Sequence, residues 1–209
     1  MKITKYPQSC ILIEDRSKRI LIDPGSFVSS KYTASDLLPL DGILITHEHQ
    51  DHVDSNLLVA LTSGGNIPVI GNESTAKVYG ELITRIVDDH QNFEVAGFKI
   101  TARELPHCLM VDGSKGPQNT GYFIDGVFFH PGDGTEVDLK AKAAAVPIAG
   151  PDVSARDSYR FIRQLGCEVV IPIHYDYFLG SPEVFAQILA GIDRSIKVIP
   201  LSDGQSTTI

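Results

Sequence analysis

Short apolar runs alternate with longer amphipathic segments along the chain, and this alternation predicts β-strands followed by α-helices. One run, residues 42–46, is typical of a strand covered on both faces, and it ends directly at a histidine. Strands are predicted at residues 10–14, 19–23, 42–46, 68–70, 93–105, 121–130, 168–173 and 196–201. Helical spacing predicts helices at residues 55–62, 74–88, 153–165 and 182–192. The pattern indicates an α/β fold with buried sheets, outer helices and long loops at one edge.

No linker or shift in composition divides the 209 residues. At roughly 150 residues per domain, this length suits one large domain better than two small ones. We therefore expect a single domain over residues 1–209. The strand-rich openings near Cys10 and near Phe93 hint at an internal duplication.

The overall charge argues against a nucleic-acid partner. Lys and Arg number 18 against 26 Asp and Glu, which leaves a formal charge of -8. Binding to phosphate backbones needs clustered cations, and no stretch interleaves basic with aromatic residues. We expect a small molecule as the partner, and the sequence leaves a homo-oligomer open.

Cysteine use and the first residues suggest a compartment. The three cysteines, Cys10, Cys108 and Cys167, form no Cys-x-x-Cys pair, so neither a disulfide framework nor a thiolate zinc site is indicated. The first residues lack an apolar signal segment, and no run approaches the roughly 18 apolar residues of a membrane span. These features predict a cytoplasmic protein without a membrane partner.

A dense polar cluster follows the apolar run 42–46. His47, His49, Asp51 and His52 fall within six consecutive residues. Residues two apart in extended chain point the same way, so His47 and His49 can offer imidazole nitrogens to one cation. Asp51 and His52 then turn toward a second position. Imidazole and carboxylate are ligands that zinc and similar ions prefer, so the cluster predicts a metal site.

The same residues read His-x-His-x-Asp-His, which resembles the signature of the metallo-β-lactamase superfamily. Three candidates for the further ligands follow in order, each near the end of an apolar strand: His107, Asp133 and His174. The resemblance extends from the Ile22-Asp23-Pro24-Gly25 turn to His174. It implies a four-layer αβ/βα sandwich, in which two mixed sheets pack face to face with helices outside.

By this resemblance, one metal is held by His47, His49 and His107 and a second by Asp51, His52 and His174, with Asp133 bridging the two. Carboxylates at Asp51 and Asp133 would offset the repulsion between two cations about 3.5 to 4 Å apart. A shared water would be acidified toward hydroxide, the attacking nucleophile. Asp51 would orient that hydroxide and accept its proton, so we assign catalytic roles to Asp51 and Asp133.

Neighbouring residues have weaker assignments. Lys115, in the breaker-rich loop 113–118, and Tyr175, directly after His174, are candidates for contacting the substrate, although a loop Lys is usually solvated and Tyr175 can simply pack. Cys108 is predicted to pack as a small apolar residue rather than to bind metal. His130 is predicted to support a ligand or to pack rather than to bind metal, and Asp23 to support a ligand histidine rather than only to form the turn before Pro24-Gly25.

Together these features predict a dinuclear metal-dependent hydrolase that cleaves a small ester, lactone or phosphoester. Several segments resemble the branch of L-ascorbate-6-phosphate lactonase-like proteins, among them residues 8–14, 119–122, 146–151 and 171–175. Zinc is the first expectation for both ions, and manganese, iron or nickel would suit the same ligands. The alternatives are a small or cyclic phosphodiesterase and a metal-binding protein without hydrolytic activity.

Overall fold

The computed structural model describes residues 1–209, which form two seven-stranded sheets. The first sheet has the order β14-β1-β2-β3-β4-β5-β6. Its strands β1 to β3 are antiparallel, whereas β3 to β6 run parallel. Their bounds are β1 Lys2–Lys5, β2 Ile11–Asp15, β3 Lys18–Ile22, β4 Gly42–Leu44, β5 Val69–Gly71, β6 Arg85–Ile86 and β14 Ser206–Thr208.

The second sheet repeats this plan in the second half of the chain, with the order β13-β12-β11-β10-β9-β8-β7. It begins as an antiparallel meander from β7 to β10 and continues parallel through β11, β12 and β13. The bounds are β7 Asn92–Val95, β8 Phe98–Glu104, β9 Thr120–Ile124, β10 Phe128–His130, β11 Ala143–Pro147, β12 Val169–Ile173 and β13 Lys197–Val198. This shared plan agrees with the suggested duplication.

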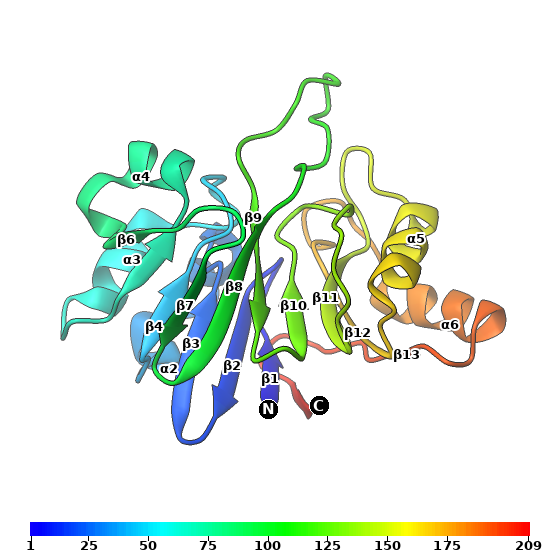
Figure 1. Ribbon diagram of the computed structural model, residues 1–209, viewed down its shortest axis with the longest axis horizontal. Helices are drawn as coiled ribbons and strands as arrows, with labels where there is room; N and C mark the ends of the chain where they lie inside the picture. The colour runs from blue at the N-terminus through cyan, green and yellow to red at the C-terminus, as the bar shows by residue number, and fades with distance from the viewer.

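Helices cover the outer faces of the two sheets. In Figure 1, α3 and α4 lie on one side of the molecule and α5 and α6 on the other. Helix α5 shows why its segment folds locally: Ser154 and Asp157 form a capping box, and Gly166, at φ 69°, ends it. The bounds are α1 Ser26–Ser29, α2 Ala34–Leu37, α3 Ser55–Thr62, α4 Glu73–Tyr79, α5 Ala155–Leu165 and α6 Pro182–Ile192.

Three apolar clusters hold these layers together. The largest has 21 buried residues from both sheets, including Ile13, Phe98 and Phe128, and fills the space between them. One cluster of 15 residues lies under α3, and another of 15 lies under α5 and α6. Each fully buried Ile or Phe side chain contributes about 1.5–3 kcal/mol. The predicted four-layer sandwich, with two mixed sheets inside and helices outside, is confirmed.

The structure differs from the predicted elements where a turn interrupts a periodic segment. The helix predicted at 74–88 ends at Tyr79, because Gly80 adopts φ 57°, and Arg85–Ile86 then joins the sheet as β6. The strand predicted at 93–105 is a hairpin of β7 and β8 with Ala96 and Gly97 in the turn. The one predicted at 121–130 likewise divides into β9 and β10.

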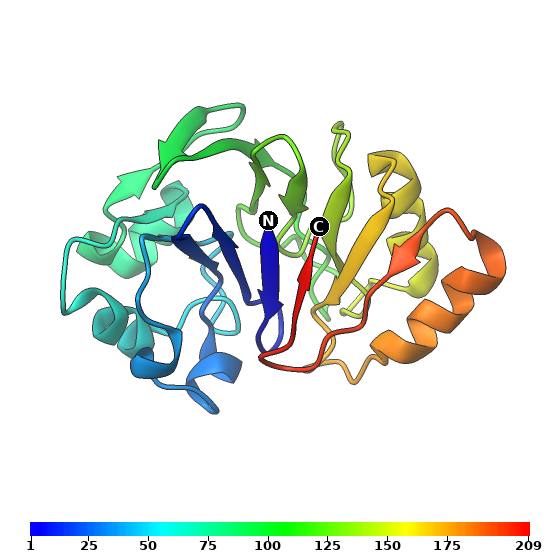
Figure 2. The same ribbon diagram turned by 90° about the horizontal axis from the view of Figure 1, so that it is seen from below.

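Several short elements had no prediction. Strands β1, β11 and β14 and helices α1 and α2 were missed. Strand β11 is rich in alanine, and the others are only three or four residues long, so periodicity is weak. Strands β1 and β14 pair along the centre of Figure 2, which brings the two ends of the chain together. No helix has the length and apolar character needed to cross a membrane.

Candidate metal centre

Loops that follow four strands bring all seven predicted ligands together. The loops after β4, β8, β10 and β12 each contribute ligands. In the second sheet β8, β10 and β12 run in the same direction, so these three strands end at the same edge of the sheet. Two groups form, and within each the potential ligand atoms lie within 4.8 Å of one another. The first contains His47, His49, His107 and Asp133, and the second contains Asp51, His52 and His174.

Asp133 lies between the two groups. Its Oδ2 is 2.9 Å from Nε2 of His174 and 3.4 Å from Nε2 of His107, and its Oδ1 is 3.0 Å from Nε2 of His52. Its carboxylate therefore touches histidines of both groups. This is the position that the resemblance implies for a bridging residue.

The turn after β4 arranges the signature residues. Nε2 of His47 lies 3.1 Å from Nδ1 of His49, so these two imidazoles meet through different nitrogens. Asp51 lies farther along, and its Oδ2 is 3.7 Å from Nε2 of both His52 and His174. Gly25 makes the turn fit, because a Cβ there would lie 1.9 Å from the carbonyl oxygen of Asp51.

In three of the candidate ligands, His52, His107 and His174, Nδ1 is held by a protein oxygen. Nδ1 of His107 is 2.6 Å from the carbonyl oxygen of Cys108, and Nδ1 of His174 is 2.7 Å from that of Ala149. Nδ1 of His52 is 2.7 Å from Oδ2 of Asp23, and the same carboxylate accepts hydrogen bonds from the Thr46 amide and hydroxyl. Such contacts fix the ring so that Nε2 faces the cluster, as in metal-binding histidines.

Buried polar atoms without partners test whether metal ions fit this cluster. Nε2 of His52, Nε2 of His107 and Oδ1 of Asp133 are buried and make no hydrogen bond of good geometry, although each lies within 3.0 to 3.4 Å of another potential ligand atom. An unsatisfied buried donor or acceptor costs about 1–3 kcal/mol. All three atoms point at the centre of the cluster, and all are nitrogen or carboxylate ligands of the kind that divalent ions take. The residues therefore fit a metal centre.

The charges of the cluster lead to the same conclusion. Burial alone would raise the pKa of Asp133, but His174 and His52 hold it well below its usual range. Burial would lower the pKa of His174 and His107, yet Asp133 raises both to about 10. The buried carboxylate thus needs positive charge beside it, which imidazolium ions or metal cations can provide.

Gln8 is a site residue that the sequence reading missed. Its buried side-chain amide donates a hydrogen bond to Oδ2 of Asp51 at 2.8 Å. Its backbone joins the loop after β12, since its amide donates to Asp176 and its carbonyl accepts from the His174 amide. Gln8 was noted only as part of the segment 8–14 that resembles lactonase-like proteins. No spacing in the sequence links it to Asp51.

Asn72 also escaped prediction. Its Nδ2 donates to the carbonyl oxygens of Thr46 and Gln118 and to Oγ1 of Thr120, at 3.0 to 3.1 Å. One buried amide thereby joins the metal-binding turn to the base of the long loop between β8 and β9. That loop, residues 105–119, rises above the sheets in Figure 1.

A cavity of about 390 Å³ opens beside the ligands. Its lining includes His49, Asp51, His107, Asp133 and His174, so members of both ligand groups face it. The size suits a small molecule. Most of the remaining wall comes from α1, the long loop and the loop after β12, and Gln50 and Pro151 complete it.

The two residues suggested to contact the substrate do not line this cavity. Tyr175 faces the opposite way: its ring lies 4.5 Å from Nζ of Lys5 and its hydroxyl donates to the carbonyl of Leu201. Tyr177 and Phe178 line the cavity instead. Lys115 is exposed on the far side of its loop, in a neighbouring hollow with Gln118.

The structure also locates the remaining histidines and cysteines. His130 belongs to neither ligand group: its Nε2 is 2.8 Å from the carbonyl oxygen of Ser9, and its Nδ1 accepts a hydrogen bond from the Gly132 amide, next to Asp133. Cys108 lines the cavity but belongs to neither ligand group. His90 is exposed beside Asp89. Asp23, predicted to support a ligand, contacts His52 as described.

Residues 2–174 match the family model described as the beta-lactamase superfamily domain. A UPF0173 protein of Pyrococcus furiosus is 29% identical over 201 residues, which cover 90% of each chain. A UPF0173 metal-dependent hydrolase of Thermoplasma volcanium is 27% identical over 218 residues, 95% of each chain. Among solved structures, Igni18, a metallo hydrolase from the archaeon Ignicoccus hospitalis, has a TM-score of 0.78 at 22% identity, covering 100% of this chain and 97% of its own. That structural likeness supports the fold.

Proposed function

The chain belongs to the metallo-β-lactamase superfamily, and on that premise we propose that this metal-dependent hydrolase uses two divalent ions to cleave a small ester, lactone or phosphoester. Membership confirms the predicted superfamily. The narrower likeness to L-ascorbate-6-phosphate lactonase-like proteins stays a prediction.

The observation that carries the proposal is the position of Asp133 between two groups of ligand atoms, with Nε2 of His52 at 3.0 Å and Nε2 of His107 at 3.4 Å from its carboxylate. In this proposal His47, His49 and His107 would hold one ion, Asp51, His52 and His174 would hold the other, and Asp133 would be available to both. Bound divalent ions would polarise a carbonyl or phosphoryl oxygen of the substrate and would lower the pKa of a coordinated water toward neutrality.

The protein's own groups orient the reactants. Asp51 lies on the cavity wall, and its pKa is held below its ordinary value: burial would raise it, but His52 and His174 overcome that effect. A bound cation would favour the same ionised form of Asp51, and a carboxylate is the form that can accept a proton from water. The amide of Gln8 holds one oxygen of this carboxylate and so fixes its direction.

The open cavity favours an enzyme over a purely metal-binding protein. Structural zinc sites are closed by four protein ligands, commonly cysteines, whereas catalytic sites leave a position for water or substrate. Here members of both ligand groups face a cavity, and no cysteine joins either group. The ligand set favours zinc, and manganese, iron or nickel would fit the same donors.

Metal content and turnover test the proposal together. Purified protein should hold two divalent ions per chain and hydrolyse at least one of a set of esters, lactones and phosphoesters. His49→Ala and Asp133→Ala should each lose bound metal and at least about a hundredfold in kcat, since no other carboxylate reaches both groups. His90→Ala, which changes an exposed histidine, is the matched control. Full metal content in both ligand variants would refute the proposed centre.

A further inference from the structure

The cavity beside the metal-binding residues has an apolar wall. Aromatic side chains form a continuous row: the rings of Phe27 and Tyr177 have centroids 5.9 Å apart, and those of Tyr177 and Phe178 are 5.0 Å apart. Phe178 then contacts His174, with centroids 5.9 Å apart. Met110 and Val111 of the long loop add to the lining. The row thus runs from the rim to a proposed ligand.

Part of this wall is exposed to water. Val111 is 84% exposed and Tyr177 is 62% exposed, although both are large apolar or aromatic side chains. Apolar surface left in water is unfavourable by roughly 25 cal/mol per Å², and a ligand that covers it recovers that free energy. Exposed apolar residues at the rim of a cavity mark a binding site. The wall therefore suits an apolar group of the substrate.

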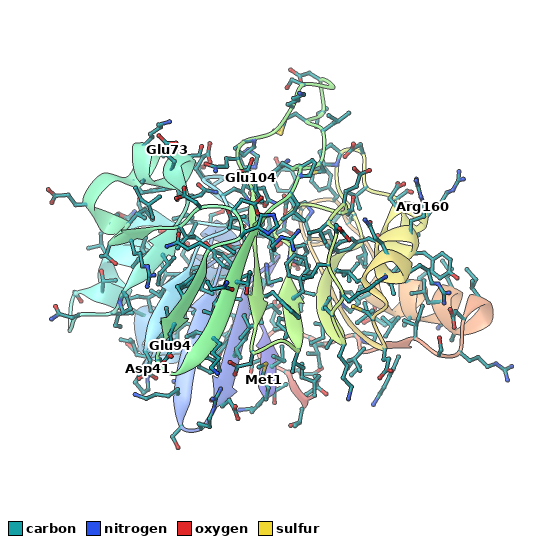
Figure 3. The ribbon with its side chains drawn as sticks, viewed as in Figure 1. Met1, Asp41, Glu73, Glu94, Glu104 and Arg160 are labelled. Atoms are coloured by element: carbon teal, nitrogen blue, oxygen red, sulfur yellow. The ribbon has the colours of Figure 1, made fainter.

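No lysine or arginine lines the cavity. Two adjoining hollows, which share His107 with the cavity, hold one each, Lys115 and Arg160, but neither of these two side chains lines the cavity itself. Figure 3 shows Arg160 at the outer edge of the molecule, on α5, where Nη1 lies 3.7 Å from Asp157. A phosphate or carboxylate arm on the substrate would have no cationic side chain to pair with.

We propose that the substrate is an electrically neutral ester or lactone whose acyl part carries an apolar group, which packs on Phe27, Tyr177, Phe178 and Val111. This inference rests on the proposed function and narrows it. It disfavours substrates with a charged arm beside the reacting group, because no cationic side chain lines the cavity and the metal centre would be used by the reacting group itself.

A series of p-nitrophenyl esters tests the apolar wall directly. With metal-loaded enzyme, kcat/KM should rise about two- to fourfold per methylene from the acetate to the hexanoate, the effect expected for partly to fully burying each methylene. The monoanionic p-nitrophenyl glutarate should react at least about tenfold less efficiently than the pentanoate, and p-nitrophenyl phosphate compares a phosphoester with these carboxylic esters. Rates with chelator-treated enzyme are subtracted in each case.

Variants at the exposed rim show whether the chain-length effect comes from contacts with the apolar wall or from a general effect of substitution on activity. Val111→Lys should reduce the chain-length effect and improve the glutarate-to-pentanoate ratio about two- to fivefold, the effect of one exposed ion pair. Tyr177→Ala should lower kcat/KM for the hexanoate more than for the acetate. Val184→Lys is the matched control, because Val184 is 51% exposed on α6 and lines no part of the cavity.

The outcomes distinguish this inference from the proposed function. A flat chain-length series, or turnover of the phosphate or the glutarate at least equal to that of the neutral ester, overturns the apolar-substrate inference and leaves a hydrolase. Absence of turnover for every ester, lactone and phosphoester by metal-loaded protein overturns the proposed function and this inference with it.

Discussion

Oδ2 of Asp23 lies 2.7 Å from Nδ1 of His52, although 29 positions separate the two residues in the chain. Both side chains are fully buried, and Asp23 also binds the amide and hydroxyl of Thr46. The carboxylate therefore holds the His52 ring from behind and fixes the direction of its unpartnered Nε2.

Asp23→Asn should weaken metal binding about 10- to 100-fold without removing any proposed ligand, because the amide is a weaker acceptor for the imidazole proton. A chelator-competition titration measures this affinity. Asp138→Asn, an exposed carboxylate on the surface, provides the control. An unchanged affinity in Asp23→Asn would show that His52 needs no support from Asp23.

Gln8→Met should weaken one of two metal-binding steps, because Asp51 loses its amide donor while the side chain keeps its length. A hydrogen bond to a charged group contributes about 1.5–3 kcal/mol, so a loss of roughly 10- to 100-fold is expected in that step. Calorimetric titration of metal-free protein resolves the steps. Gln164→Met, at an exposed glutamine, should bind metal like the parent, and equal weakening of both steps would contradict the role given to Gln8.

Gly116→Ala should displace His107. A Cβ at this position would lie 2.3 Å from Nδ1 of His107, which ties the long loop to a proposed ligand. Overpacking of this kind destabilises by about 1–3 kcal/mol, and we expect a lower melting temperature together with reduced metal content. At Gly64 a Cβ meets nothing within 4 Å, so Gly64→Ala should change neither. Normal metal content in Gly116→Ala would indicate that the loop moves independently of His107.

The metal-free protein should lose stability as pH rises from about 7 to 10. Burial would lower the pKa of His107 and His174, but Asp133 raises both to about 10, above their ordinary value of 6.5. Stability from these raised groups is fully present below 6.5 and disappears as pH rises through 10. Melting curves of chelated protein across this range check the trend.

The metal-loaded protein should not show that decline, since its ligand histidines are already unprotonated over the same range. The difference in melting temperature between the two forms should therefore widen from pH 7 to 10. Parallel curves for the two forms would mean that these imidazoles carry no extra proton in the metal-free protein.

Contiguous features of this site could be read from the sequence, whereas features made by tertiary contact could not. The signature from His47 to His52 lies in one turn, and His107 and His174 each come soon after an apolar strand. Strand ends meet at one edge of an α/β sheet, so their convergence was predictable. Gln8 and Asn72 act through hydrogen bonds to segments more than 25 residues away, which no local pattern encodes.

Errors in the sequence reading have similar physical causes. Tyr175 was a candidate for the substrate wall because it adjoins His174, but neighbouring side chains leave the backbone in different directions, and its ring packs beside Lys5. The helix predicted to 88 followed apolar spacing past Gly80, where the left-handed backbone ends α4. In both places the local backbone conformation decided the outcome, and the pattern of side chains along the sequence did not reveal it.

Asn72 joins the base of the long loop to the turn that carries the histidines through hydrogen bonds, whereas Val111 near the tip of the loop is exposed to solvent. Chemistry and selectivity are thereby assigned to opposite ends of one segment. Exchange of residues 109–115, with His107 and Gly116 kept, should therefore change substrate preference more than metal binding, which makes this loop the natural point at which to redirect the enzyme toward new substrates.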